Sequence, residues 1–198
     1  LGSRDATSAV VENRDRVARY LGAAPGQVIT LHQVHSGVAI VADAPIRRDR
    51  LPKADAIVTR TPGLAVGALA ADCAPVLLAD PVAKVVGAAH AGWRGALGGI
   101  LEAATAAMES LGADRRRIRA AVGPCIGQPA YEVGPEFEAE FISRDVANAA
   151  YFIRPGAGSS AHFDLSSYVT DRLRRAGLDA VQQCSPCTFT DESILFSY

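Results

Sequence analysis

Apolar residues recur along the chain at two spacings, one typical of helices and one typical of strands. From Val10 to Leu21 they repeat at helical spacing, with Thr7 or Ser8 as an N-cap and Gly22 as the residue that ends the helix. The same spacing predicts three later helices, over 95–111, over 135–142, and from an Asp164 cap to Gly177.

Short apolar, often β-branched runs fall between these helices and are separated by turn signals such as Thr61-Pro62-Gly63. They predict strands over 28–34, 38–41, 56–59, 64–70, 76–78, 85–89 and 118–122. The stretch 155–160 is expected to be a flexible loop. Because strands and helices are interleaved, the pattern predicts an α/β fold, a single-domain layered sandwich of mixed β-sheets with flanking helices over residues 1–198.

The charge balance argues against a polyanionic partner. The 198 residues include 20 Lys and Arg and 21 Asp and Glu, which gives a net charge of −1. A near-neutral chain has no general attraction to nucleic acid or to an anionic membrane, so we expect neither as a partner. The adjacent residues Arg115, Arg116 and Arg117 are interpreted as a solvated surface turn.

The same sequence favours a cytoplasmic location. No apolar run reaches the ~18–20 residues that a membrane span requires, and no signal peptide is recognisable. Leu1 suggests that the natural N-terminus lies upstream. Four cysteines are too few for a disulfide scaffold in a chain of this length, which favours a reducing compartment.

Reactive side chains are concentrated in three segments with small neighbours, 32–37, 71–75 and 89–95. In the last, His90 and Arg94 are expected on a turn between a strand and a helix. A helix N-terminus and a guanidinium together suit a phosphate or carboxylate, and Gly92 lets the backbone approach a ligand. The alternative is that Trp93 anchors this turn and its neighbours are incidental.

The other two segments add a thiol, a carboxylate and an imidazole. Cys73 is expected to end an apolar strand, where a cysteine is often only a small buried residue. Asp72 beside it follows a mostly apolar stretch and therefore needs a partner or a function. His35 alternates with Gln33, so the two should share one face of a strand.

Two imidazoles and one thiolate would leave a fourth zinc position open, as in catalytic zinc sites. The separations between His35, Cys73 and His90 match no local metal motif, so the residues alone favour structural roles over a metal site. Cys184 and Cys187 form a lone C-x-x-C, interpreted as two unlinked thiols near a strand. We expect these two and Cys125, which could line the pocket, to be dispensable for metal binding.

The segments, in this order, resemble the YfiH-type family, whose members are known as laccase-domain proteins, multicopper polyphenol oxidases and purine nucleoside phosphorylases. The resemblance covers nearly the whole chain, and two of its motifs, Ala71-Asp72-Cys73 and 90–95, are highly specific. The other matching pieces are 33–35, 54–57, 61–63, 74–75, 123–127, 131–134, 164–165, 187–188 and 196–198. The resemblance implies that His35, Cys73 and His90 are the ligands of a Zn²⁺ cofactor. It also implies a layered fold that is often compared with a toxin deamidase.

The resemblance further implies the chemistry. It indicates phosphorolysis of adenosine, inosine, guanosine and methylthioadenosine to the free base and ribose-1-phosphate, with adenosine deaminase activity. The residues fit, because zinc lowers the pKa of bound water to about 7 and makes hydroxide available to attack C6 of adenine. Arg94 could hold phosphate, and Asp72 is a catalytic candidate as a proton carrier. We expect a monomer or a weak dimer.

The chain departs from the family pattern at three places. His32 has no counterpart and receives no role, Ser36 stands where glycine is usual, and the family continues past Tyr198 with basic residues and a last strand.

Three alternatives to the zinc enzyme stay open. One is a metal-free hydrolase or deamidase with Cys73 as nucleophile and His90 as base. Another is a non-catalytic protein that binds nucleosides or metal. A laccase-like polyphenol oxidase is the weakest, because four histidines cannot supply the several copper sites that it requires.

Overall fold

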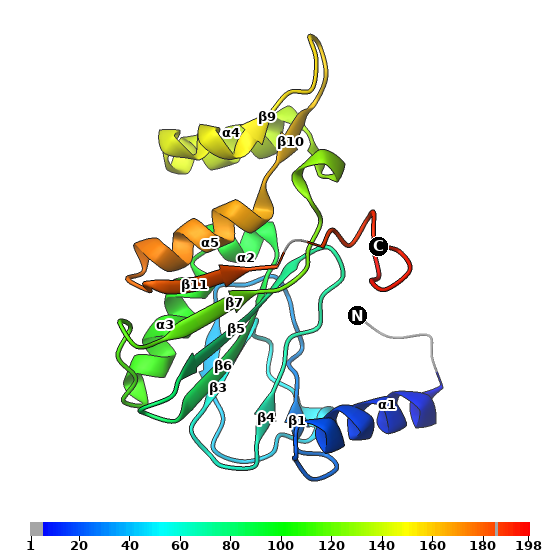
Figure 1. Ribbon diagram of the computed structural model, residues 1–198, viewed down its shortest axis with the longest axis vertical. Coiled ribbons are helices and arrows are strands. Elements are labelled where there is room, and N and C mark those ends of the chain that lie inside the picture. Colours follow the sequence, from blue (N-terminus) through cyan, green and yellow to red (C-terminus); the bar gives the residue numbers. More distant parts are fainter. Residues whose placement is uncertain (1–5, 185) are drawn as a thin grey trace.

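The computed structural model describes residues 6–184 and 186–198. A six-stranded mixed sheet in the order β11-β7-β5-β6-β3-β2 forms its centre (Figure 1). The strands are β2 (Ala39–Val41), β3 (Ala56–Thr59), β5 (Ala74–Asp80), β6 (Val85–Ala91), β7 (Arg119–Val122) and β11 (Ala180–Gln183). The central pairs β3·β6, β5·β6 and β5·β7 are antiparallel, whereas the edge pairs β2·β3 and β7·β11 are parallel. The predicted α/β class with mixed sheets is therefore confirmed.

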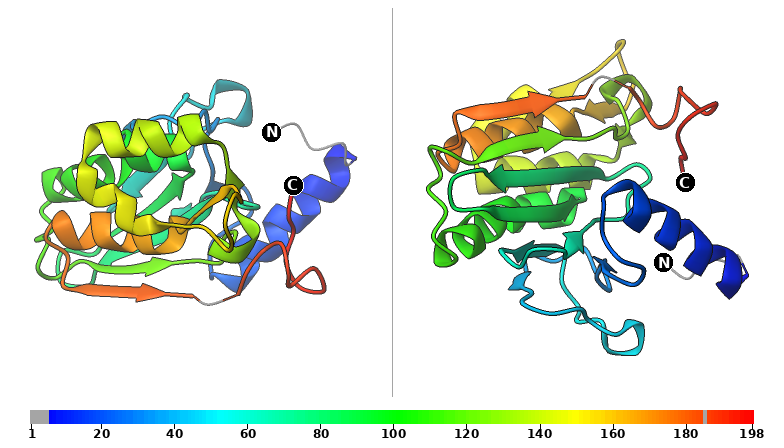
Figure 2. Two further views of the ribbon diagram at one scale, coloured as in Figure 1. Left: turned by 90° about the horizontal axis from the view of Figure 1, so that it is seen from above. Right: turned by 60° about the horizontal axis from the view of Figure 1, so that its bottom comes forward.

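Helices cover one face of this sheet. The elements α2 (Trp93–Leu97), α3 (Ile100–Ser110) and α5 (Leu165–Arg175) follow the strands in sequence, and α3 and α5 lie along the same side (Figure 2). Strand β5 shows the matching alternation, because Val76 and Leu78 are buried under the helices whereas Leu77 is 57% exposed. As predicted, Asp164 caps α5 by accepting a hydrogen bond from the Ser167 N–H at 2.9 Å.

The single helix predicted over 95–111 is wrong in one respect. The chain breaks into α2 and α3 at Gly98 and Gly99, and Gly99 has a φ of +91°. Glycine adopts this left-handed conformation without the steric cost that a side chain adds. The break lets α2 start directly after β6 while α3 runs along the sheet.

A smaller layer stands beyond α5 at the top of Figure 1. It consists of β8 (Glu132–Val133), β9 (Phe152–Ile153) and β10 (Ala161–Phe163), with α4 (Pro135–Arg144) and the 3₁₀ helices η2 (Gln128–Ala130) and η3 (Val146–Tyr151). Closely packed aromatic rings, among them Phe137, Phe141 and Phe163, fill the space between these elements, with Phe137 stacked on Phe141 and edge to face with Phe163. The periodicity predicts α4 correctly, but strands of two or three residues are too short to give a sequence pattern.

The N-terminal region contains α1 (Thr7–Tyr20), the 3₁₀ helix η1 (Arg48–Arg50), and the parallel pair β1 (Val28–Ile29) and β4 (Ala65–Val66). The predicted cap is wrong, because Ala6 occupies the N-cap position and Thr7 and Ser8 lie inside the helix. The strands predicted over 28–34 and 64–70 shrink to two residues each. Beyond them the side chain of Gln33 bonds both the N–H and the C=O of Leu69, at 2.8 and 2.7 Å, in place of a backbone ladder.

The structure bears on three further features of the sequence: its apolar runs, its arginine run and its cysteines. Within the described ranges, no helix has both the length and the apolar character needed to cross a bilayer. The arginine run 115–117 does form a turn, but Arg117 also pairs with Asp80, whose side chain is fully buried. All four cysteines are free thiols, as expected.

Candidate functional site

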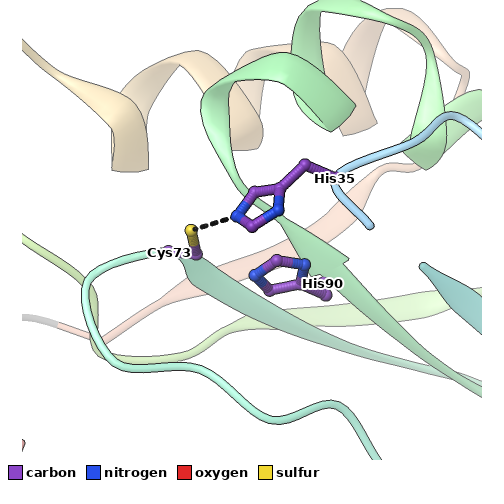
Figure 3. Close-up of side chains that lie close together, drawn as sticks. All are labelled: His35, Cys73 and His90. Atoms are coloured by element: carbon purple, nitrogen blue, oxygen red, sulfur yellow. Dashed lines mark hydrogen bonds between the residues drawn. The ribbon is translucent and has the colours of Figure 1, made fainter. Parts of the chain in front are cut away.

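Three side chains from distant parts of the chain converge at one end of the central sheet (Figure 3). The potential ligand atoms of His35, Cys73 and His90 all lie within 4.8 Å of one another. The Cys73 Sγ lies 3.7 Å from the His35 Nε2, and the two imidazole rings are edge to face with centroids 4.8 Å apart. His90 is buried whereas His35 is exposed, so the group lies at the protein surface with one open side.

The structure corrects the local setting of each of these side chains. His90 lies inside β6, not on the turn after it, because the strand continues to Ala91. Cys73 directly precedes β5 and does not end a strand. His35 has a φ of +60°, which places it in a turn, so the predicted face shared with Gln33 does not exist.

Gly92 leaves the space in which the group comes together. A Cβ at this position would lie 2.7 Å from His35 Cδ2 and 2.8 Å from Cys73 Sγ. Its φ of −68° is open to any residue, so the requirement is for space and not for conformation. The sequence linked Gly92 to the approach of a ligand, whereas in the structure it accommodates the protein's own side chains.

Asp55 organises the group and was missed by the sequence analysis. Its side chain is fully buried, and its Oδ1 accepts hydrogen bonds from His90 Nδ1–H at 2.9 Å and from the His35 N–H at 3.0 Å. Its Oδ2 accepts three more, from the Ser36 N–H at 2.6 Å, the Ser36 hydroxyl at 2.7 Å and the Val34 N–H at 3.2 Å. A carboxylate in the apolar run 54–58 was the signal, because a buried charge needs partners.

Burial and hydrogen bonding set the charges of these groups. Burial raises the pKa of Asp55, but the hydrogen bonds from His90, Ser36 and Val34 outweigh it and hold that pKa below its usual value. Burial lowers the pKa of His90, against the opposing effect of Asp55. Burial, with the nearby charges of Asp72 and Asp55, raises the pKa of Cys73 to about 11.

The carboxylate of Asp72 has partners of its own. Its Oδ1 accepts hydrogen bonds from the hydroxyls of Thr188 at 2.7 Å and Ser197 at 2.8 Å, and its Oδ2 accepts one from the Tyr198 N–H at 2.9 Å. Asp72 therefore holds the C-terminal residues Ser197 and Tyr198 close to Cys73. These three hydrogen bonds supply the partners that an ionisable side chain needs after an apolar stretch.

Arg94 is exposed in the first turn of α2, and its Cζ lies 4.3 Å from the centroid of the Trp93 ring. Among the residues that the structure describes, it forms no salt bridge. Trp93 packs beside Phe137 and Phe141, as the alternative interpretation of this turn expects, and the role of Arg94 as an anion ligand stays a prediction.

The remaining candidates are not members of the group formed by His35, Cys73 and His90. Cys125 and Cys187 face each other across an isolated β-bridge, and the Gly127 N–H donates to the Cys187 Sγ at 3.1 Å. Cys184 is exposed, and Ser185 inside the C-x-x-C lies outside the described residues. His32 forms a backbone bridge with Lys53.

A family model described as multi-copper polyphenol oxidoreductase laccase matches residues 1–198. The chain belongs to this family. It is 43% identical over 194 residues to a purine nucleoside phosphorylase of Streptomyces coelicolor, covering 98% of this chain and 78% of the relative. A purine nucleoside phosphorylase of Deinococcus radiodurans is 39% identical over 189 residues, with 96% of this chain and 71% of the relative covered.

Solved structures agree with this assignment. A Neisseria meningitidis protein of the DUF152 family has a TM-score of 0.85 at 34% identity, covering all of this chain and 79% of that one. The Bacillus licheniformis hypothetical protein YfiH has a TM-score of 0.87 at 27% identity, with 100% of this chain and 78% of that one covered. The YfiH-type fold expected from the sequence motifs is therefore confirmed.

The donor set of this family member fits a zinc ion. Zinc takes imidazole and thiolate ligands at about 2.0–2.3 Å, which places the ligand atoms of one ion within about 4 Å of each other. The ligand atoms of His35, Cys73 and His90 lie within 4.8 Å of one another, up to about 0.8 Å beyond that limit, so these side chains would have to close in slightly around an ion. The copper in the family's description is a poorer fit, because a multicopper oxidase needs many histidines and the chain has four.

Proposed function

We propose that the chain is a zinc-dependent purine nucleoside phosphorylase. Its substrates are adenosine, inosine, guanosine and methylthioadenosine, and its products with phosphate are the free base and ribose-1-phosphate. The observation that carries the proposal is the convergence of His35, Cys73 and His90 in a chain 43% identical to a protein named purine nucleoside phosphorylase. The resemblance supplies the substrate class, and the donor set supplies the metal.

In this proposal His35, Cys73 and His90 hold the zinc ion. When bound, the ion supplies Lewis-acid chemistry and an open coordination position. Arg94 binds phosphate, because its exposed guanidinium is suited to a bidentate contact with an oxyanion. We assign proton transfer to Asp72, the carboxylate adjacent to Cys73 in the chain, whose Oδ1 also accepts hydrogen bonds from the hydroxyls of Thr188 and Ser197.

The proposal includes slow deamination of adenosine at the same site. This reaction consumes water and no phosphate, so it depends less on Arg94. One site that serves two reactions cannot be complementary to both transition states, and we expect modest turnover in each.

One observation also suits the metal-free hydrolase. Asp55 binds His90 Nδ1 at 2.9 Å and would orient the ring as a base toward Cys73. That arrangement leaves His35, whose Nε2 lies 3.7 Å from the same sulfur, without a function. The zinc site uses all three side chains, and we therefore favour it.

Metal and product analysis test the proposal together. About one zinc per chain should copurify, and Cys73→Ala or His90→Ala should remove it, with Cys184→Ser as the matched control. Chromatography of the four nucleosides with and without phosphate should show free base and ribose-1-phosphate only with phosphate. A folded protein that binds no zinc, leaves all four nucleosides untouched and hydrolyses amides, and that loses this hydrolysis when Cys73 is alkylated, would establish the hydrolase instead.

A further inference from the structure

Asp55 connects the two imidazoles of the site although they come from separate elements. One carboxylate oxygen, Oδ1, accepts hydrogen bonds from the ring of His90 and from the backbone of His35, at 2.9 and 3.0 Å. The carboxylate is fully buried, so neither contact is weakened by competition with bulk water. The positions of both rings therefore depend on one side chain.

The hydrogen bond from His90 to Asp55 determines which ring nitrogen of His90 is left to bind a metal ion. An ionised carboxylate only accepts hydrogen bonds, so Nδ1 carries the proton that is donated to Oδ1. Nε2 is then left with its lone pair free and on the opposite side of the ring. Neutral imidazole with this tautomer is a metal ligand through Nε2.

For His35 the contact stabilises an unfavourable backbone. The φ of +60° is uncommon for a residue with a side chain. The N–H groups of three successive residues, 34–36, point at the carboxylate, at 3.2, 3.0 and 2.6 Å. Such a concave array of N–H groups is an anion-binding nest, and here the anion is Asp55 itself. The bound carboxylate holds the turn that carries His35 toward Cys73.

We infer that Asp55 is a positioning residue that presents both histidines to the metal, and that metal affinity depends on it through two ligands at once. The inference rests on the proposed zinc function of the same site. Carboxylates that orient a single histidine ligand already change metal affinity by about 10–100-fold. Because Asp55 orients two, we expect its loss to lie at the upper end of this range.

Asparagine at this position tests the inference with almost no change of shape. In Asp55→Asn one oxygen becomes an NH₂ group that donates hydrogen bonds. If the NH₂ group takes the position of Oδ1, it faces the N–H donors of His90 and His35. If it takes the position of Oδ2, it faces the N–H groups of Val34 and Ser36. Either orientation leaves at least two donors without an acceptor. With the NH₂ group at the Oδ1 position, the contacts to both histidines are lost directly, and with it at the Oδ2 position, the hydrogen bonds from the N–H groups of Val34 and Ser36 that hold the turn of His35 are lost.

Asp80 provides the matched control. Its side chain is also fully buried, and it accepts hydrogen bonds from the N–H groups of Val82, Ala83 and Asp114 at 2.9, 3.0 and 2.9 Å. It ends β5, whereas Cys73 precedes the start of the same strand, so it lies at the far end from the site. Asp80→Asn imposes the same kind of buried defect without touching either histidine.

The experiment measures zinc affinity by competition with a chromophoric chelator, and cobalt binding by the absorption of the cobalt–thiolate centre. Folding of each variant is checked by circular dichroism. We expect zinc to bind about 100-fold more weakly to Asp55→Asn, with an altered cobalt spectrum, and within about threefold of wild type to Asp80→Asn. Equal zinc affinity in folded Asp55→Asn and wild type overturns the inference.

A second measurement needs no variant and covers the case in which Asp55→Asn does not fold. Long-range ¹H–¹⁵N spectra of the zinc-loaded wild type should show His90 protonated at Nδ1 and coordinated through Nε2. Coordination through Nδ1 overturns the inference. A wild type that binds zinc but leaves nucleosides intact contradicts the proposed function while the role of Asp55 stands, so the two failures are distinct.

Discussion

Gly92→Ala adds one methyl group at the point where two of the proposed zinc ligands meet. The new Cβ would lie 2.7 Å from His35 Cδ2 and 2.8 Å from Cys73 Sγ. Carbon atoms in contact prefer separations of about 3.5–4.0 Å, so each neighbour must move away by about 0.7 Å or more. The backbone at Gly92 already has a φ that alanine accepts, so the effect is one of space.

The steric clash should weaken metal binding more than it weakens the fold. His35 is exposed, so its ring can swing outward and relieve the clash at little expense to the fold. We expect the free energy of unfolding of the metal-free protein to fall by about 1 kcal/mol, the lower end for overpacking. Zinc–ligand bond lengths vary by only about 0.2 Å, and a ring of His35 held outward cannot meet that requirement together with Cys73. We therefore expect zinc affinity to fall by at least about 100-fold, or about 2.8 kcal/mol.

Urea unfolding of the metal-free protein and zinc competition with a chelator separate the two quantities. Gly67→Ala is the matched control, because its Cβ would meet only Thr30 Cγ2, at the ordinary contact distance of 3.7 Å. It should leave zinc affinity unchanged. If Gly92→Ala binds zinc as tightly as Gly67→Ala, then His35 and Cys73 do not hold the same ion.

Three further predictions concern phosphate, the other thiols and acid. Arg94→Ala should weaken phosphorolysis by about 2–3 kcal/mol in kcat/KM, through loss of a charge-assisted hydrogen bond, and should affect adenosine deamination less; equal losses would assign Arg94 to the nucleoside. The double variant Cys184→Ser, Cys187→Ser should retain full zinc by elemental analysis, and loss of the metal would show that the site is misassigned. The hydrogen bond from Arg116 lowers the pKa of Asp114 from 3.8 to about 2, so its contribution to stability is present above pH 4 and lost between about pH 4 and pH 2; urea unfolding of Asp114→Asn should show a smaller loss over this range.

Local signals explain which parts of the fold could be predicted. Strand β3 lies over the predicted range 56–59, and the Asp164 cap of α5 is present, because each depends on residues adjacent in sequence. The predictions fail where tertiary contacts decide the outcome. Gln33 replaces a strand ladder with side-chain hydrogen bonds to Leu69, and Ala6 begins α1 although Thr7 and Ser8 are better caps.

In the candidate site too, residues with a sequence signal could be predicted and the tertiary contacts between them could not. Motif resemblance picks out His35, Cys73 and His90, and the structure brings them together. Spacing could not have done so, because the three come from a turn, the start of one strand and the end of another. Asp55 carried a weaker signal, a charge in an apolar run, and its partners become visible only when the register of β3 against β6 is known.

That register explains why the site forms at this edge of the sheet. Strand β6 runs antiparallel to both of its neighbours, so the end that carries His90 lies beside the starts of β3 and β5. Asp55 is the residue before β3 and Cys73 the residue before β5. Pro75 pairs with His90, and the His90 N–H bonds the Asp55 C=O at 2.7 Å. A slip of one residue in β6 would turn the His90 ring to the opposite face, so the same hydrogen bonds that hold the sheet also hold the site together.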